Sequence, residues 1–160
     1  MARLPFQVLI YLYRPLADGE FAYALLQRAD HGYWQAIAGG GETRPGGEAE
    51  TPLEAARRET FEETGLTPQA PFIQLQTIEP VPVTEFAGRA HWGDDLYVIP
   101  QHCFGVQAPQ TELLLSREHT TYCWLSFQDA FRLVRFEGNR TALWELNCRL
   151  KKTIQPPPEI

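Results

Sequence analysis

The sequence predicts an α+β fold with a mixed β-sheet, and two observations support this prediction. Runs of β-forming residues come first, one helix follows, and further strands precede a C-terminal helical region. The chain has 160 residues, 44% of them hydrophobic, which is enough for one sizeable core. We therefore expect a single domain over residues 1–153 and a proline-rich tail over residues 154–160.

The expected strands are short apolar runs separated by turn signals. Residues 6–13 (FQVLIYLY) are almost continuously apolar, which is typical of a buried strand. The following Pro15 and Asp18-Gly19 favour a hairpin-type turn into the next strand. We expect further strands at residues 21–27, 33–38, 71–79, 97–105 and 120–125. Residues 80–95 predict a long irregular loop, and such loops are usually functional or mobile.

The clearest helix covers residues 52–64. Thr51 and Glu54 form a capping-box pattern around a proline at the first helical position, and Gly65 is a natural stop. A glycine-rich segment before this helix predicts a loop that leads into it.

A second helical region is expected near the C-terminus. Residues 126–129 (SFQD) form a helix-start signature. A final helix is expected from about residue 139 to residue 152, with Asn139 as its N-cap.

Three glutamates crowd the end of the helix over residues 52–64. Glu59, Glu62 and Glu63 fall within about 100° of the helix circumference, where like charges repel. Carboxylates are also disfavoured at a helix C-terminus. A bound cation would offset both effects, and hard oxygen ligands suit Mg²⁺ or Mn²⁺. The alternative is an acidic, solvated helix face.

Composition limits the partners and the compartment. The formal net charge of −6 argues against general binding to nucleic acids or anionic membranes. A divalent ion would allow an acidic protein to bind an anionic small molecule. Cys103, Cys123 and Cys148 form no disulfide framework, which favours a reducing cytoplasm. The apolar residues 4–13 are too few to span a bilayer. The sequence leaves the oligomeric state open.

From Glu50 onward the chain resembles the signature of the Nudix hydrolases, G-x5-E-x7-R-E-U-x-E-E-x-G-U. The matching positions are Glu50, Arg58, Glu59, Glu62, Glu63, Gly65 and Leu66. Two positions depart from it: Arg44 replaces the first glycine, and Thr60 replaces an aliphatic residue. The first departure leaves open which glycine carbonyl approaches a metal ion. The resemblance implies an α/β/α sandwich in which the signature forms a loop–helix–loop.

Short motifs elsewhere resemble one branch of this family. They are YWQ at residues 33–35, SREH at 116–119, YCWL at 122–125 and GNR at 138–140. The branch is that of the dihydroneopterin triphosphate pyrophosphohydrolases, also called dATP pyrophosphohydrolases. The resemblance implies Mg²⁺-dependent cleavage of a nucleoside triphosphate or its pterin analogue to a monophosphate and pyrophosphate.

The family resemblance also assigns roles to the acidic residues. It implies metal binding by Glu59, Glu62, Glu63 and Glu118, with catalysis by Glu62, Glu63 or Glu118. Arg58 would orient the glutamates; the alternative is an ordinary i,i+4 partner of Glu54 and Glu62. For Glu118 the alternative is a solvated surface position. The sequence does not identify which glutamate is the general base.

Candidate substrate contacts complete the expected site. Gly39 and Gly40 lack a Cβ and would let the backbone approach the metal ion or a phosphate; the alternative is a flexible turn. The branch resemblance implies that Arg3 and Arg28 bind the triphosphate and that Asn139 touches the substrate. Aromatic stacking makes Trp34 and His91 candidate faces for a purine or pterin ring, although Trp34 also suits a core or pocket wall.

Other functions compete with this prediction. Within the family, the alternatives are hydrolases of dinucleoside polyphosphates, ADP-ribose or oxidised nucleotides. Outside catalysis, the alternatives are a ligand sensor that binds a nucleotide without hydrolysing it, and a plain metal-binding or structural domain. The retained signature glutamates favour an enzyme over both of these.

Overall fold

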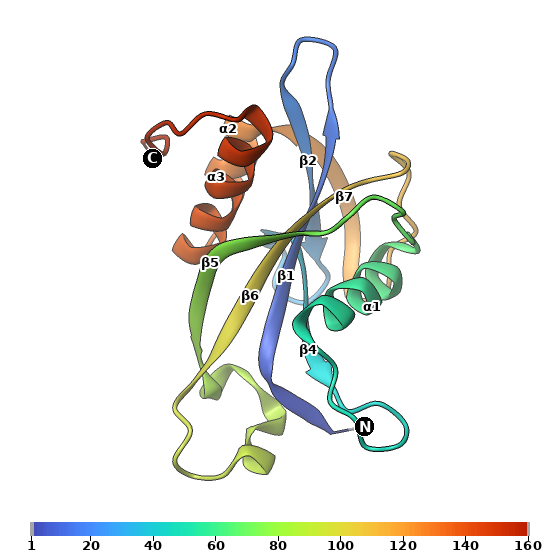
Figure 1. The fold of residues 1–160 in the computed structure, drawn as a ribbon, viewed down its shortest axis with the longest axis vertical. Coiled ribbons are helices and arrows are strands. Elements are labelled where there is room, and N and C mark those ends of the chain that lie inside the picture. Colours follow the sequence, from blue (N-terminus) through green and yellow to red (C-terminus); the bar gives the residue numbers. More distant parts are fainter. Residues whose placement is uncertain (1, 160) are drawn as a thin grey trace.

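Strand β1 (Arg3–Pro15) is the centre of a seven-stranded mixed sheet in the computed structural model, which describes residues 2–159 (Figure 1). It pairs in parallel with β6, and in antiparallel fashion with β4 along its first half and with β2 at its end. The sheet order is β3-β2-β1-β6-β5, with β4 paired to β1 and β7 paired to β2. The remaining strands are β2 (Phe21–Arg28), β3 (Trp34–Gln35), β4 (Ile37–Glu42), β5 (Ile73–Pro82), β6 (Val98–Gln107) and β7 (His119–Ser126).

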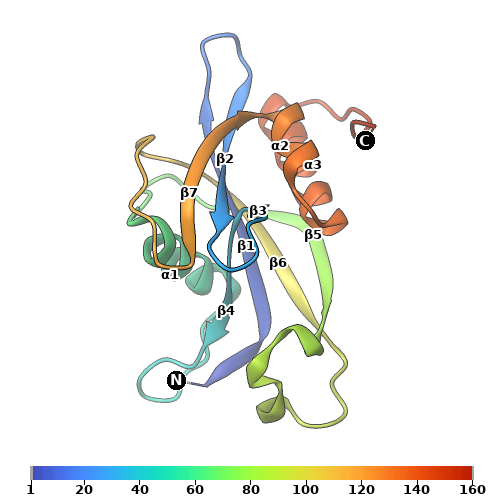
Figure 2. The same cartoon turned by 180° about the vertical axis from the view of Figure 1, so that it is seen from behind.

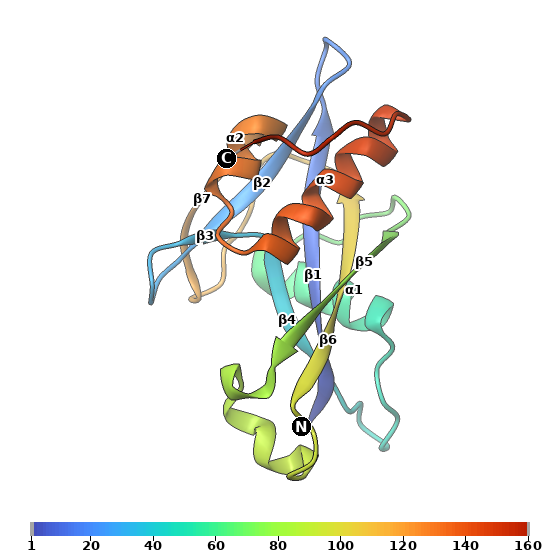
Figure 3. The same ribbon diagram turned by 90° about the vertical axis from the view of Figure 1, so that its left-hand side faces the viewer.

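Helices cover both faces of this sheet. Helix α1 (Pro52–Thr64) lies on one face, and α2 (Phe127–Leu133) and α3 (Glu137–Lys151) lie on the other (Figure 3). Side chains of a strand alternate between its two faces, so β1 contributes to two cores. Val8, Ile10 and Leu12 pack in the cluster that contains α1, whereas Leu9, Tyr11 and Tyr13 pack in the cluster that contains α3. The predicted α+β fold with an α/β/α sandwich is confirmed.

The capping signals predicted for α1 and α2 are used. Thr51 Oγ1 accepts a hydrogen bond from the Glu54 backbone N–H, and the Glu54 carboxylate accepts one from the Thr51 N–H. Gly65 ends α1 in the left-handed conformation, with φ of 73°. Ser126 caps α2 by accepting from the Asp129 N–H. These contacts are local in sequence, and the bounds of α1 match the prediction.

The predicted strand at 33–38 is wrong in its extent. It is divided into β3 and β4, and the glycines at 39–41 lie within β4 rather than in a loop. Gly39 pairs with Val8 and Gly40 with Gln7. A Cβ at Gly39 would overlap the Glu59 carboxyl group, and one at Gly40 would overlap the Arg3 guanidinium. The glycines therefore let side chains lie directly over the strand.

The predicted irregular loop at 80–95 is also partly wrong. Strand β5 continues to Pro82 because Pro80, Val81 and Pro82 pair with residues 98–100 of β6. Prolines are tolerated there because β5 is an edge strand. Two short 3₁₀ helices follow, η1 (Val83–Glu85) and η2 (Ala87–Trp92).

The prediction that Asn139 is an N-cap is wrong as well. Helix α3 begins at Glu137 with Phe136 as its N-cap, which places Asn139 inside the first turn. A Cβ at Gly138 would overlap the Glu79 carboxyl group, so the first turn of α3 packs closely against β5.

The C-terminal tail follows the last helix. Helix α3 stops at Lys151, before the prolines of the predicted tail. Met1 and Ile160, the outer limits of the predicted domain and tail, lie outside the described residues. Within residues 2–159, no helix is both long enough and apolar enough to cross a membrane.

Gly105 tests the packing of α3 on the sheet. A Cβ at this position would overlap the fully buried Leu146 side chain, so Gly105→Ala should lower the free energy of unfolding by about 1–3 kcal/mol. Gly88→Ala is the matched control, because no atom lies within 4 Å of its added Cβ. Urea unfolding of both variants measures the difference, and equal stabilities would contradict this packing.

Candidate active site

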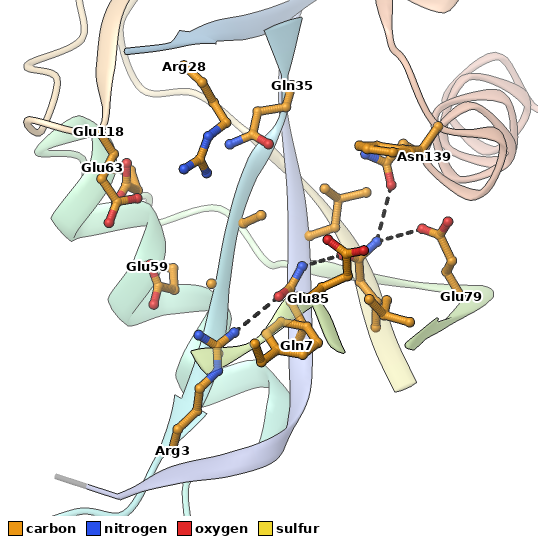
Figure 4. A pocket seen from close by; sticks show the side chains of 18 of the residues that line it. Arg3, Gln7, Arg28, Gln35, Glu59, Glu63, Glu79, Glu85, Glu118 and Asn139 are labelled. Carbon is orange, nitrogen blue, oxygen red and sulfur yellow. Dashed lines mark hydrogen bonds between the residues drawn. The ribbon is translucent and has the colours of Figure 1, made fainter. Parts of the chain in front are cut away.

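One pocket of about 710 Å³ lies where β1, β4, α1 and the start of α3 converge, and its volume suits a nucleotide-sized molecule (Figure 4). Most of the predicted site residues line it. The lining includes Arg3, Gln7, Arg28, Gln35, Gly39, Gly40, Glu59, Glu62, Glu63, Glu79, Gln101, Glu118, Phe136 and Asn139.

Helix α1 contributes the acidic wall of the pocket. Glu59 and Glu63 are one turn apart and only 8% and 4% exposed, whereas the Glu62 side chain is 50% exposed. Gly39 leaves room for the Glu59 carboxylate beside β4. The pattern of three glutamates therefore resolves into two buried carboxylates that face the pocket and one at its edge.

Arg58 joins the signature residues to one another. Its Nε and Nη2 atoms donate to both carboxylate oxygens of the buried Glu50, at 2.8 and 3.0 Å. Its Nη2 atom also donates to the Gly40 carbonyl at 2.7 Å, and Nη1 donates to Glu59 at 2.9 Å and Glu62 at 3.2 Å. One guanidinium thus connects the preceding loop, β4 and α1.

The alternative that paired Arg58 with Glu54 does not hold. The Glu54 carboxylate accepts the capping hydrogen bond from Thr51 and lies 3.3 Å from the Arg44 guanidinium. Arg58 does keep the i,i+4 contact with Glu62.

Burial and the Arg58 charge act in opposite directions on the neighbouring carboxylates. Burial alone would raise the pKa of Glu50, but the hydrogen bonds from Arg58 and the Glu42 N–H outweigh it and lower that pKa. Burial raises the pKa of Glu59 to about 7, and the charges of Glu62 and Glu63 add to this effect against Arg58. Burial therefore disfavours the ionised form of Glu59 more than the Arg58 charge favours it.

Glu63 is held by hydrogen bonds from Ser116, just before β7, and from His119, the first residue of β7. Strand β7 runs alongside β2 (Figure 2). The Glu63 Oε2 atom accepts from Ser116 Oγ at 2.8 Å and lies 2.9 Å from His119 Nδ1. The Gln35 amide nitrogen lies 3.1 Å from His119 Nε2, so Nε2 accepts and Nδ1 carries the proton donated to Glu63. Burial raises the pKa of Glu63, but the hydrogen bonds from His119 and Ser116 outweigh it and lower that pKa.

The structure does not bring every predicted residue to the pocket. Glu118 lies beside Glu63, and Arg3, Arg28 and Asn139 also line the pocket. Trp34 packs instead against the core cluster that contains α3. His91 is exposed on η2 and is not part of the lining.

Several lining residues were missed from the sequence: Gln7, Gln35, Glu79 and Gln101. Gln7 and Gln101 are polar residues inside predicted strands, and buried polar groups require partners. That signal could have identified them, but not the contacts between them.

The acidic wall has the donor chemistry that a hard divalent cation prefers. No group of three or more His, Cys, Asp or Glu side chains within residues 2–159 is close enough to enclose a metal ion. However, Arg58 occupies only Oε1 of Glu59, and Ser116 and His119 occupy only Oε2 of Glu63. Each carboxylate keeps one oxygen that accepts no hydrogen bond from an N–H or serine hydroxyl donor of the described residues, and the Glu118 side chain lies beside Glu63. These residues fit Mg²⁺ or Mn²⁺.

Glu50 tests the contribution of the Arg58 contacts to stability. Glu50→Ala should lower the free energy of unfolding by about 2–3 kcal/mol. The loss is smaller than for a fully buried pair, because Arg58 is partly exposed and still pairs with Glu59 and Glu62. Glu48→Ala is the control, because its side chain is 79% exposed in an i,i+4 pair and should change stability by less than about 0.5 kcal/mol.

The pH dependence of this difference has a definite sign. The folded-state pKa of Glu50 is below its ordinary value of 4.5, so its contribution is present above pH 4.5. It disappears as the pH falls through the folded-state pKa. Chemical unfolding of the wild type and Glu50→Ala should therefore converge in acid. A gap that stays constant down to pH 2 would contradict the assignment.

Known proteins of one family are similar to this chain. The NUDIX domain family matches residues 6–144. A NUDIX hydrolase structure from Listeria monocytogenes is 32% identical, with a TM-score of 0.79 over 93% of this chain and 96% of that chain. Two further structures share the fold at lower identity. The dihydroneopterin triphosphate pyrophosphohydrolase of E. coli is 23% identical, with a TM-score of 0.71 over 93% of this chain and 99% of that chain.

The other is an Ap4A hydrolase binary complex from C. elegans, which is 22% identical, with a TM-score of 0.66 over 93% of this chain and 99% of that chain. Nudix hydrolases as a family generally use divalent metal ions. The family match covers most of the sequence, and three of the four signature glutamates, Glu59, Glu62 and Glu63, line one pocket. This chain belongs to the Nudix family and is a hydrolase that acts on pyrophosphate bonds.

Proposed function

We propose that this chain is a Mg²⁺-dependent pyrophosphohydrolase, with Mn²⁺ as a possible substitute. Its substrate would be a nucleoside triphosphate or dihydroneopterin triphosphate, cleaved to a monophosphate and pyrophosphate. One observation carries the proposal: the acidic wall of Glu59, Glu63 and Glu118 shares a nucleotide-sized pocket with Arg3 and Arg28. A metal ion and the phosphates of a substrate would thereby be bound side by side.

The metal ion would be held by carboxylate oxygens. Glu59 and Glu63 each offer an oxygen that accepts no hydrogen bond from an N–H or serine hydroxyl donor of the described residues, and Glu62 and Glu118 also line the pocket. Gly39 remains the candidate carbonyl ligand, because the Gly40 carbonyl already accepts from Arg58. When bound, a divalent ion neutralises phosphate charge and lowers the pKa of coordinated water.

Glu118 is our choice for the residue that takes the proton from the attacking water. Glu62 is bound by Arg58, and Glu63 is held by His119 and Ser116, so the positions of both are fixed by other residues. The Glu118 side chain lies exposed at the pocket beside Glu63. A general base needs access to water, and Glu118 has it.

Two arginines would bind the phosphate groups. Arg3 stacks on Phe86, with its Cζ atom 4.6 Å from the ring centre, and its buried Nε has no hydrogen-bond partner within residues 2–159. Burial lowers the pKa of Arg3, so an anion would stabilise its charge. Arg28 is paired with Asp30 at 2.6 Å, and a phosphate would compete with that carboxylate.

The wider setting supports a small-molecule enzyme. We propose one Nudix domain over residues 1–153 with a short tail over 154–160. The net charge of −6 disfavours nucleic acid and membrane surfaces as partners. The three cysteines are free, which supports a cytoplasmic location.

Removal of the Glu63 charge tests the metal assignment. Glu63→Gln should lower pyrophosphate release at saturating Mg²⁺ by at least about 100-fold. The fold should be retained, because the amide oxygen of glutamine can still accept the hydrogen bonds from Ser116 and His119. Glu112→Gln, which is exposed and outside the pocket lining, is the control. Wild-type turnover in Glu63→Gln would refute the assignment.

Metal removal and a substrate panel separate this function from its competitors. EDTA should stop pyrophosphate release, and excess Mg²⁺ should restore it. No release from any substrate under either condition would favour a non-catalytic sensor. Faster hydrolysis of a dinucleoside polyphosphate, ADP-ribose or an oxidised nucleotide would replace the proposed substrate class while keeping the site.

Glu118→Gln tests the choice of general base. We expect kcat to fall by about 10- to 100-fold with KM nearly unchanged, because the amide keeps the shape but cannot take a proton. Steady-state kinetics over a range of Mg²⁺ concentrations measures this. Unchanged kcat and metal dependence would make Glu118 a surface residue only.

A further inference from the structure

A line of hydrogen bonds crosses the pocket away from the acidic wall (Figure 4). Arg3 Nη2 donates to Gln7 Oε1 at 3.1 Å, and Gln7 Nε2 donates to Gln101 Oε1 at 2.7 Å. Gln101 Nε2 then donates to Glu79 Oε2 at 2.9 Å and to Asn139 Oδ1 at 3.2 Å. A guanidinium has only donors, so Arg3 fixes the direction of every amide in the line.

This direction determines what the end of the line offers to a ligand. Gln101 is 4% exposed, and both its amide oxygen and its amide nitrogen are engaged. Because Asn139 uses its oxygen to accept from Gln101, it presents its NH₂ group elsewhere, and that nitrogen has no partner within residues 2–159. The pocket therefore gains a hydrogen-bond donor at Asn139.

Glu79 supplies acceptors beside this donor. Gln101 and the Gly138 backbone N–H donate to its carboxylate, but no ion pair with Glu79 is found in the described part of the chain. A carboxylate has about four lone-pair directions, so acceptor capacity remains. Burial raises the pKa of Glu79 against the Gly138 hydrogen bond. Donors from a ligand would satisfy this partly desolvated group.

An apolar surface adjoins the two polar residues. Phe136, directly before α3, is 45% exposed and lines the pocket. Leu9, Pro80 and Val81 also contribute to the lining. An aromatic side chain beside matched donors and acceptors is the usual arrangement for holding a flat heterocycle by stacking and by its edge.

We propose that Glu79 and Asn139 determine base specificity by reading the 2-amino-4-oxopyrimidine edge that guanine and pterins share. The ring N–H and the exocyclic amine would donate to Glu79, and the ring carbonyl would accept from Asn139 Nδ2. Adenine has no carbonyl on this edge, and its unprotonated ring nitrogen would face the carboxylate. This inference refines the substrate of the proposed function and therefore rests on it.

A purely structural role for Glu79 makes a different prediction. Its carboxylate lies against the first turn of α3, where it could serve only as a cap for the helix. In that case its loss would lower stability and affect all ligands equally. Specific recognition of an edge changes the ranking of ligands.

Binding of monophosphates to the wild-type protein tests the proposal without any need for turnover. Isothermal calorimetry should show that GMP or dihydroneopterin monophosphate binds at least tenfold more tightly than IMP, which lacks the 2-amino group, and AMP. A preference for GMP or for dihydroneopterin monophosphate supports the proposal and shows whether the recognised ring is guanine or a pterin. Equal affinities for GMP, IMP and AMP, with no preference for the pterin, would overturn it.

Variants separate recognition from capping. Glu79→Gln should weaken binding of the preferred monophosphate by at least tenfold and leave AMP within about twofold. Glu137→Gln is the matched control, because its side chain is 88% exposed in the same helical turn and should change neither. If Glu79→Gln weakens the binding of all monophosphates equally, Glu79 serves only as a helix cap, and the proposal is overturned. Should Glu79→Gln fail to fold, Asn139→Asp replaces the donor by an acceptor and should remove the same preference; its persistence would overturn the proposal.

A failure of this inference can be distinguished from a failure of the proposed function. Pyrophosphate release from the corresponding triphosphates is measured on the same samples. No release from any triphosphate would refute the proposed function, whereas the ranking of monophosphates would still decide whether Glu79 and Asn139 read this edge.

Discussion

The structure depends on one guanidinium group that binds three parts of the chain at once. Arg58 holds Glu50 before α1, the Gly40 carbonyl in β4, and Glu59 in its own helix. Without these contacts, the buried Glu50 carboxylate would lack its counter-charge and the acidic end of α1 would lose its nearest cation. The same contacts leave one oxygen of Glu59 free, so the group that stabilises the fold also prepares the proposed metal site.

The two ends of the pocket divide the chemistry between them. The acidic wall consists of Glu59 and Glu63 from α1 and Glu118 from the segment before β7. Hydrogen bonds from Ser116 and His119 to Glu63 connect this segment to α1. The opposite end comes from β5, β6 and α3, where amides fix the positions of Glu79 and Asn139. With its phosphate chain near the acidic wall and its ring near Glu79 and Asn139, one elongated substrate would lie across β1 (Figure 4).

Local signals explain what the sequence could predict. The bounds of α1 followed from Thr51, Glu54 and Gly65, which act within a few residues of each other. The spacing of Arg58, Glu59 and Glu63 followed from the periodicity of one helix, and the match to the family signature gave the fold. Arg58 was expected to orient the glutamates of its own helix; its contact with Glu50, eight residues earlier, was not predicted.

Long-range pairing explains what the sequence could not predict. The glycines of β4 look like a loop until the sheet places Glu59 and Arg3 over them. The amide line joins Gln7 to Gln101 across 94 residues, and His119 reaches Glu63 across 56. Trp34 is an aromatic residue suited to stacking, but it packs half-buried against the core cluster that contains α3 and is not part of the pocket lining.

The most direct measurement is a crystal structure with Mn²⁺ and a non-hydrolysable triphosphate, in which anomalous scattering locates the metal. The account predicts an anomalous peak coordinated by the free oxygens of Glu59 and Glu63, next to the phosphates. A bound triphosphate with no peak at these carboxylates, or with a peak coordinated elsewhere, would contradict it.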